Sequence, residues 1–192
     1  MVSDRDWPVG SWQDLADRLD RAAAMTRWSC TEPALAGWAS VDDLPAVLAQ
    51  GTDRTRADAV LGALIRCAAP DGGDDPDAAL VLLHLLRPGV FALAQRLTGL
   101  QGMDGPAVPA VVAELACRIR TFPWRRRPRA IAANLLLDTK RVLWRQHDRL
   151  SRLEAHLVEP GTPWWENRPD HPAADPAPER ELADLLGWVV GS

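Results

Sequence analysis

Apolar residues recur every three or four positions along most of this chain, with polar residues between them, and this spacing is typical of amphipathic helices. The first stretch predicts a helix from Ser11, a good N-cap, to about Trp28. Further apolar runs predict a short helix near residues 42–49 and a longer one near 54–69. The N-terminal third is therefore expected to be helical.

Three more helices are predicted in the middle of the chain. Asp75 and Pro76 are typical of a helix start, an N-cap followed by proline at the first helical position. Pro88 is expected to end that helix. The three predicted ranges are 76–87, about 89–99 and about 107–121.

The longest predicted helix is opened by Pro128 and covers about 128–157. Asp138 is expected to pair with Arg141, three residues on. Leu137 and Trp144 share a separate strip, where they either pack on another element or stay exposed for stacking on nucleobases. The main apolar face, predicted to be core, holds Ile131, Ala132, Leu135, Leu136, Val142, Leu143, Leu150 and Leu153.

These patterns predict an all-α, multi-helix bundle. Six prolines and few aliphatic residues make 159–178 typical of a linker. Trp164 and Trp165 in it are either a docking peptide or a cover for the core. The expected organisation is an N-terminal helical extension, a helical domain, the Pro-rich linker and a C-terminal helix, over residues 1–70, 71–158, 159–178 and 179–192.

Composition favours a globular protein of the cytoplasm. Hydrophobic residues make up 47% of the chain, enough for a core. Cys30, Cys67 and Cys117 lie far apart without a C-x-x-C motif, so we expect reduced, buried thiols. No signal peptide is indicated, and no apolar stretch approaches the roughly 18 residues that cross a membrane.

The net charge of −4 conceals a strong asymmetry. Residues 118–152, here the basic segment, carry eleven of the 22 basic and two of the 26 acidic residues, a local charge of +9 against −13 for the remainder. Such separation indicates a surface that meets a polyanion. The alternative is an ordinary solvated helix face.

Aromatic residues stand among these arginines. Phe122 and Trp124 precede Arg125, Arg126 and Arg127. Guanidinium groups bind phosphates bidentately and aromatic rings stack on unpaired bases, so this mixture is typical of a nucleic-acid surface. The alternative is that both aromatic side chains pack in the turn between two helices.

No catalytic or metal chemistry is indicated. His84 lies in a Leu-rich helix and is expected to be packed, and the other histidines lack metal-ligand spacing. The four aspartates of 70–77 lack EF-hand spacing. Phosphate-loop and nucleophile-elbow motifs are missing from the sequence. We therefore expect a non-enzymatic protein without cofactor or metal.

One stretch resembles a known family. Residues 131–141 read Ile-Ala-Ala-Asn-Leu-Leu-Leu-Asp-Thr-Lys-Arg, similar to the I-A-x-N-L-x-x-D-x-x-R pattern in region 2 of bacterial sigma-70-type factors, notably the extracytoplasmic-function group. The resemblance covers about 77–150. Arg127 and Pro128 stand where the family carries an aromatic pair.

The resemblance implies a sigma region 2-like helical core. In that family the second helix of the region docks on RNA polymerase, and the loop and long helix after it recognise the −10 promoter element. Glu114 and Arg118 would then lie near the polymerase. The residues expected to face DNA are Trp124, Arg125, Arg126, Arg127, Arg129, Asn134, Lys140, Arg141, Trp144 and Arg145.

Two hypotheses of function follow. The first is a sigma-factor-like, DNA-binding transcription regulator that contacts promoter DNA and RNA polymerase through 107–152. The second is a non-enzymatic helical adaptor whose basic patch binds an acidic protein. By resemblance, 179–192 would be either the start of a truncated region 4-like domain or the end of a one-domain relative. No feature indicates an oligomeric state.

Overall fold

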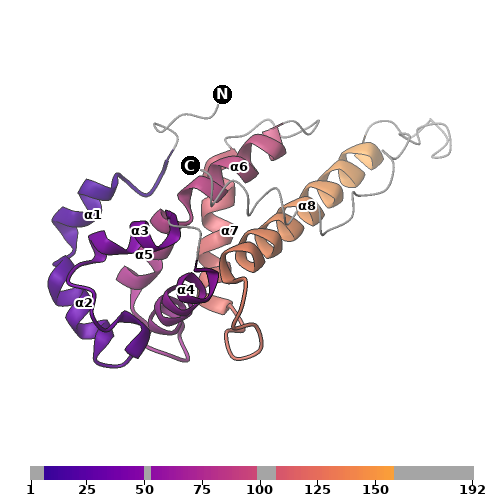
Figure 1. The fold of residues 1–192 in the computed structure, drawn as a ribbon. Coiled ribbons are helices and arrows are strands. Elements are labelled where there is room, and N and C mark those ends of the chain that lie inside the picture. Colours follow the sequence, from indigo (N-terminus) through magenta and orange to yellow (C-terminus); the bar gives the residue numbers. More distant parts are fainter. Residues whose placement is uncertain (1–6, 50–52, 99–106, 158–192) are drawn as a thin grey trace.

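The computed structural model describes residues 7–49, 53–98 and 107–157 (Figure 1). Within these ranges the protein is all-α and contains no strand, as the sequence predicted. The elements are α1 (Trp12–Arg18), α2 (Arg21–Ser29), the 3-10 turns η2 (Pro33–Leu35) and η3 (Val41–Asp43), α3 (Leu44–Ala49), α4 (Arg54–Ala68), α5 (Pro76–Leu85), α6 (Arg87–Thr98), α7 (Ala107–Thr121) and α8 (Ile131–Leu157).

The prediction of a single helix from Ser11 to Trp28 is wrong, because this stretch forms two helices, α1 and α2. Ser11 does cap α1, and its side chain and that of Asp14 bond each other's backbone amides. However, Leu19 adopts an extended conformation, and Asp20 starts a new helix by accepting a hydrogen bond of 3.0 Å from the amide of Ala23. A local aspartate cap therefore overrides an apolar pattern that runs on without a gap.

Two helix boundaries also differ from prediction. Pro88 does not end a helix but lies in the first turn of α6, where its missing amide proton costs no hydrogen bond. The longest helix begins at Ile131 and not at Pro128, because Ala130 has a positive φ of 51° that helical backbone does not allow.

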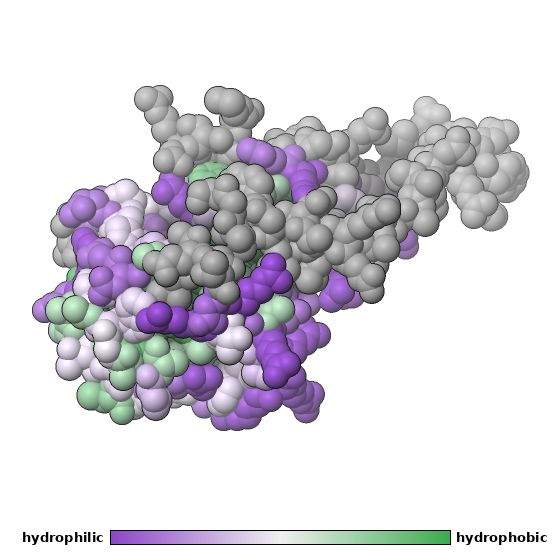
Figure 2. All heavy atoms as spheres, viewed as in Figure 1, coloured by the Kyte–Doolittle hydropathy of each residue, from purple (hydrophilic) through white to green (hydrophobic). Residues whose placement is uncertain are grey.

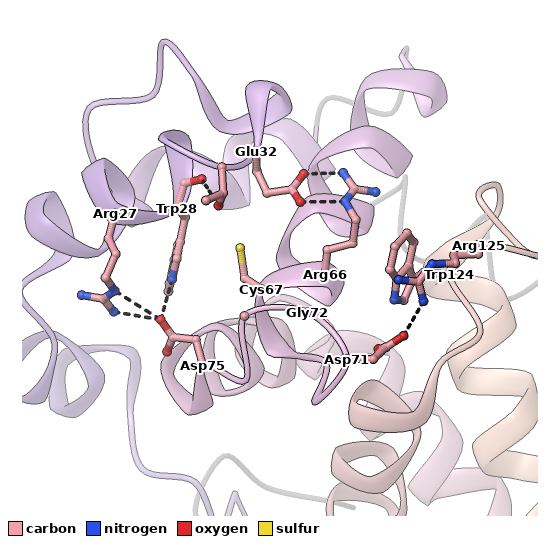
Figure 3. A pocket seen from close by; sticks show the side chains of 12 residues that line it. Arg27, Trp28, Glu32, Arg66, Cys67, Asp71, Gly72, Asp75, Trp124 and Arg125 are labelled. Carbon is pink, nitrogen blue, oxygen red and sulfur yellow. Dashed lines mark hydrogen bonds and ion pairs between the residues drawn. The ribbon is translucent and has the colours of Figure 1, made fainter.

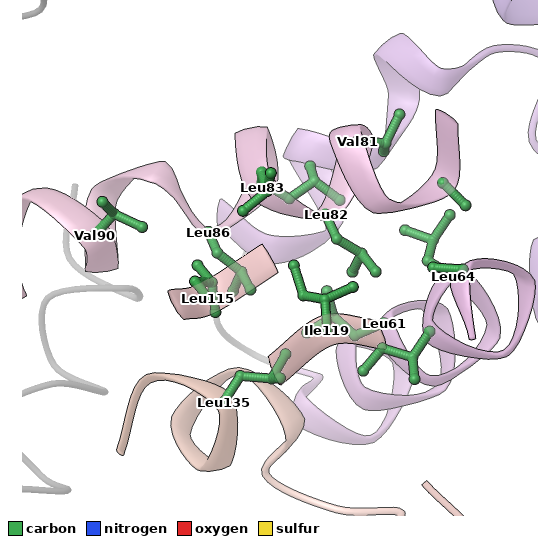
Figure 4. Close-up of a cluster of buried hydrophobic side chains, with 14 of the residues drawn as sticks. Leu61, Leu64, Val81, Leu82, Leu83, Leu86, Val90, Leu115, Ile119 and Leu135 are labelled. Carbon is green, nitrogen blue, oxygen red and sulfur yellow. The ribbon is translucent and has the colours of Figure 1, made fainter. Parts of the chain in front are cut away.

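α7 lies at the centre of the bundle and packs against α4, α5, α6 and α8. Figure 4 shows the core around it, where Leu115 and Ile119 of α7 meet Leu61 of α4, Leu82 of α5 and Leu135 of α8. All five side chains are at most 2% exposed. Burial of apolar area at this junction is the main force that fixes α8 on the body.

The core is continuous across the predicted boundary at residue 70. Trp28, Leu35 and Leu64 from the N-terminal side belong to the same buried cluster as the leucines of α5 and α7. The N-terminal helices thus pack directly on the domain that follows. The predicted linker and C-terminal helix, 159–192, lie outside the described residues.

The last turns of α8 extend beyond the body (Figure 1). Leu150 and Leu153 are 58% and 50% exposed, so their prediction as core residues was wrong. Ile131 and Leu143, nearer the start of the helix, are buried as predicted. The helical wheel gave the correct face but not the point at which the neighbouring helices stop.

The cysteines are free, but only Cys67 is buried. Cys30 and Cys117 are exposed, so the prediction of three buried thiols was wrong for two of them. Cys117 lies on a side of α7 that no other described helix covers, although its neighbours Ala116 and Ile119 contact the core.

His84 is packed between aromatic rings, as predicted. Its ring lies edge-on to Trp7 and Trp12, with centroids 5.7 and 5.6 Å away. Burial lowers the pKa of His84, nearby Arg87 lowers it further, and Asp14 opposes them. The histidine therefore holds the N-terminal segment on α5 in its neutral form.

This burial predicts a loss of stability in mild acid. Because the pKa of His84 is lower in the folded chain, its contribution is complete above the usual value near 6.5 and is lost as pH falls through the folded value. We expect calorimetry to give a lower Tm at pH 5 than at pH 7.5. His84→Phe should remove that part of the decrease, and an unchanged pH dependence in this variant would contradict the assignment.

In the described part of the chain, no single helix combines the length and apolar content needed to cross a membrane. α5 and α6 have the necessary length and apolar content only when they are taken together, and the two helices are bent by 64° relative to each other.

Candidate nucleic-acid interface

The loop between α7 and α8 is anchored at its start by Phe122. This side chain is buried in the core, so Phe122 packs in the turn between the helices and is not available for stacking on bases. The amides of Arg126 and Arg127 then donate hydrogen bonds of 2.9 and 3.1 Å to the carbonyl of Pro123. The loop is thus a closed turn that holds the backbone of Arg126 and Arg127 in place.

The start of α8 is held by Asp58 of α4. Its carboxylate accepts hydrogen bonds from the amides of Ala130, at 2.7 Å, and Ile131, at 2.9 Å. Asn134 closes the same turn, because its side-chain amide donates to the carbonyl of Arg129 at 2.9 Å. A negative group at a helix N-terminus also interacts favourably with the helix dipole. The strained Ala130 is therefore held from both sides.

A shallow cavity of about 440 Å³ lies where this loop meets α8. We call it the arginine groove. In Figure 2 strongly hydrophilic residues gather over this region, at the lower right of the body. The groove is lined by Arg126, Arg127, Pro128, Arg129, Asn134, Leu137 and Arg141.

The charge of the groove is only partly neutralised. Asp138 bonds both Arg127, at 2.7 Å, and Arg141, at 3.3 Å, which confirms the predicted pair with Arg141. Arg126 and Arg129 make no ion pair within the described residues and are exposed. Four guanidinium groups thus line the groove, and in the described part of the chain only two of them are paired, with a single carboxylate. This arrangement suits an anionic ligand with several phosphates.

Trp124 and Arg125 lie away from the groove. Arg125 pairs with Asp71, and its guanidinium lies 3.9 Å from the centroid of the Trp124 ring. Arg66 of α4 lies 5.7 Å from the same ring. Trp124 is half-buried and packs against the core. The loop therefore divides the predicted aromatic and basic cluster between two sides.

The remaining predicted residues of α8, Lys140, Trp144 and Arg145, do not line the groove. Lys140 lies 5.3 Å above the ring of Trp144, which is 37% exposed. Leu137 and Trp144 share one strip of α8, as predicted, and Leu137 lines the groove, half-buried. Arg145 is exposed one turn beyond Arg141. The structure thus brings five of the ten predicted residues into the groove: Arg126, Arg127, Arg129, Asn134 and Arg141.

The predicted polymerase-facing residues form a pair of their own. Arg118 donates a hydrogen bond of 2.6 Å to Glu114, one turn earlier on α7. The glutamate side chain is only 13% exposed, whereas that of Arg118 is 38% exposed. Arg118 is therefore the more accessible of the two to a partner.

Sequence reasoning missed the acidic residues that shape the site. Asp58 caps α8 from 72 positions away, and Asp71 and Asp74 pair with Arg125 and Arg120 across about 50 positions. Only tertiary packing brings these groups together, so no local pattern indicates them. The role of Asp138 toward Arg127, eleven positions earlier, was also missed.

Within the described ranges, histidine, cysteine and carboxylate side chains form no cluster that could hold a metal ion. No protein-family model, curated protein or solved structure matches this chain. The site is therefore interpreted from its own geometry.

Proposed function

We propose that this chain is a sigma-factor-like, DNA-binding transcription regulator of the bacterial cytoplasm, without enzymatic activity. Promoter DNA would bind in the arginine groove, and core RNA polymerase would bind near Arg118 on α7. The observation that carries the proposal is the gathering of four guanidinium groups in one groove at the start of α8, where, among the described residues, a single carboxylate pairs with only two of them.

The geometry supports a phosphate backbone as the ligand. The groove is shallow and exposed, as a contact with an extended polymer requires, and Arg126 and Arg129 have unpaired donors among the described residues. The side chain of Asn134 bonds the carbonyl of Arg129 and so fixes the backbone of that residue beside the groove. Phosphate contacts of this kind position a protein on DNA, and base contacts then specify sequence.

Removal of the negative charge of Asp138 should strengthen the binding of DNA. We expect Asp138→Asn to increase affinity for duplex DNA by roughly three- to tenfold, because it frees Arg127 and Arg141 and removes a charge that repels phosphate. The measurement is fluorescence anisotropy with a labelled duplex at fixed salt.

The matched control is Asp148→Asn. This residue lies on the same helix, ten positions further on, and pairs with Arg152 at 3.8 Å. It changes the net charge equally but lies about 15 Å from Asp138 along the axis. Equal effects of the two substitutions would show that overall charge, and not the groove, sets the affinity.

The polymerase part of the proposal needs a separate test. The tagged full chain is mixed with bacterial core RNA polymerase, purified, and incubated with a fluorescent promoter library. Co-purification with selection of promoters supports a sigma-like factor. DNA binding without polymerase would contradict that part and leave a repressor or architectural protein, and binding only to an acidic protein would favour an adaptor.

A further inference from the structure

A second cavity, of about 540 Å³, lies on the other side of the α7–α8 loop, between α2, α4 and the turn that follows α4. Figure 3 shows Trp28 and Trp124 on opposite sides of it, with the sulfur of Cys67 between them. Its volume falls within the range typical of small-molecule sites, about 300–1,000 Å³. The cavity shares no lining residue with the arginine groove.

The floor of the cavity is rigid. The turn after α4 donates its amides to the end of the helix, with Gly73 bonding the carbonyl of Arg66 and Asp75 that of Cys67, both at 2.9 Å. A Cβ on Gly72 would lie only 2.0 Å from the carbonyl oxygen of Arg66. Glycine is thus required where the turn meets the helix, and the hollow is built into the backbone.

The charges around the cavity cancel in pairs. Arg66 bonds Glu32 through two nitrogens, at 2.8 and 2.5 Å. Arg27 bonds Asp75 at 2.9 Å, and Asp75 also accepts a hydrogen bond of 2.8 Å from the indole of Trp28. The third pair joins Arg125 to Asp71. Three cations thus face three carboxylates, so neither an anion nor a cation is favoured over a neutral ligand.

The wall between these pairs is apolar and aromatic. Burial, with the charges of Glu32 and Asp75 adding to it, raises the pKa of the Cys67 thiol from 9.0 to about 11, so the sulfur is uncharged at neutral pH. A protonated buried thiol behaves as a small hydrophobe. Trp28 and Cys67, 2% and 5% exposed, close the back of the cavity, and half-buried Trp124 offers the aromatic surface for a flat ring.

We propose that this cavity binds a small, neutral, planar heteroaromatic molecule, whose ring lies against Trp124 in front of the buried Cys67 and whose polar edge bonds the ion pairs at the rim. The paired rim supplies hydrogen-bond donors and acceptors without net charge. This inference stands without the proposed nucleic-acid function.

The test uses indole and benzimidazole as probes on the full-length chain, followed by saturation-transfer NMR and calorimetric titration. We expect Kd values near or below about 1 mM, as is usual for fragments of this size. Thr31→Phe, at an exposed position on the cavity wall, should weaken binding at least tenfold by filling the space. Thr55→Phe, on α4 and outside the lining, is the matched control and should bind as the wild type does.

Absence of binding by both probes, or equal affinity in Thr31→Phe and wild type, would overturn the proposal. A second readout does not depend on the folding of that variant. In a chain carrying Cys30→Ser and Cys117→Ser, bound indole should slow alkylation of Cys67 at pH 9 by severalfold. Alkylation at an unchanged rate would place the probe elsewhere and refute the assigned site.

Discussion

Simultaneous replacement of Arg126, Arg129 and Arg141 by alanine is expected to reduce affinity for duplex DNA at least a hundredfold, with little change in stability. A charged hydrogen bond contributes on the order of 1.5 kcal/mol, which is about tenfold in Kd. Three such contacts that act independently therefore contribute more than the hundredfold loss expected here. All three side chains are exposed, and exposed substitutions usually change the free energy of unfolding by less than about 0.5 kcal/mol.

The salt dependence of DNA binding gives an independent measure of how many phosphates the three arginines contact. Each phosphate neutralised on duplex DNA contributes about 0.9 to the slope of log K against log salt, so the triple variant should lose between two and three from the slope. The charge-matched control replaces Arg18, Arg149 and Arg152, which lie outside the groove. If this control loses as much affinity and slope as the groove variant, then binding is diffuse and the groove is not the site.

Asp58→Ala is expected to have the largest effect on stability among single exposed or half-exposed substitutions. It removes the acceptor of two backbone amides at the start of α8, one of which belongs to buried Ile131. Loss of two charge-assisted hydrogen bonds and of the helix-dipole interaction should cost about 2–3 kcal/mol. For a chain of this length that corresponds to a decrease in Tm of roughly 5–10 °C.

Urea unfolding followed by circular dichroism measures this change. Asp53→Ala is the matched control, because Asp53 caps α4 through one hydrogen bond, of 2.9 Å to the amide of Arg56, and should cost about 1 kcal/mol. Asp58→Asn keeps one oxygen acceptor, so its cost in the free energy of unfolding should lie between those of Asp58→Ala and Asp53→Ala. A cost for Asp58→Ala no larger than that for Asp53→Ala would mean that Asp58 does not hold α8.

The link through Asp58 gives the N-terminal helices a role in the proposed site. Asp58 belongs to α4, whereas the groove is formed by the loop and α8. The Asp58 variant should therefore also weaken DNA binding, because Arg129 and Asn134 lie within the segment whose backbone it fixes. Residues 1–70 are thus expected to assist the interface structurally.

The sequence predicted those parts of the fold that depend on neighbouring residues. Asp75 caps α5, as the Asp-Pro pair indicated, and α7 matches its predicted range because its valines, Leu115 and Ile119 all face one central core. The break at Leu19 and Asp20 was missed, because an aspartate can either sit on a helix surface or start a new helix. Only the packing of the two short helices decides between these outcomes.

The candidate site was predictable in composition but not in arrangement. A count of charges gave +9 for the basic segment, yet Arg120 and Arg125 are paired with aspartates from the turn after α4. The predicted cluster of Trp124 with the arginines is divided, because the closed turn at Pro123 directs Trp124 and Arg125 toward α4. Such pairings between distant segments depend on how helices pack, and periodicity carries no information about them.

The most direct test of the proposed interface is photo-crosslinking of the full-length chain to duplex and single-stranded DNA that carries 5-iodouracil, with mass spectrometry of the linked peptides. We expect crosslinks within residues 126–141 that disappear in the Arg126, Arg129 and Arg141 triple variant. Crosslinks confined to the N-terminal helices or to the end of α8, or crosslinks unchanged in that variant, would contradict it.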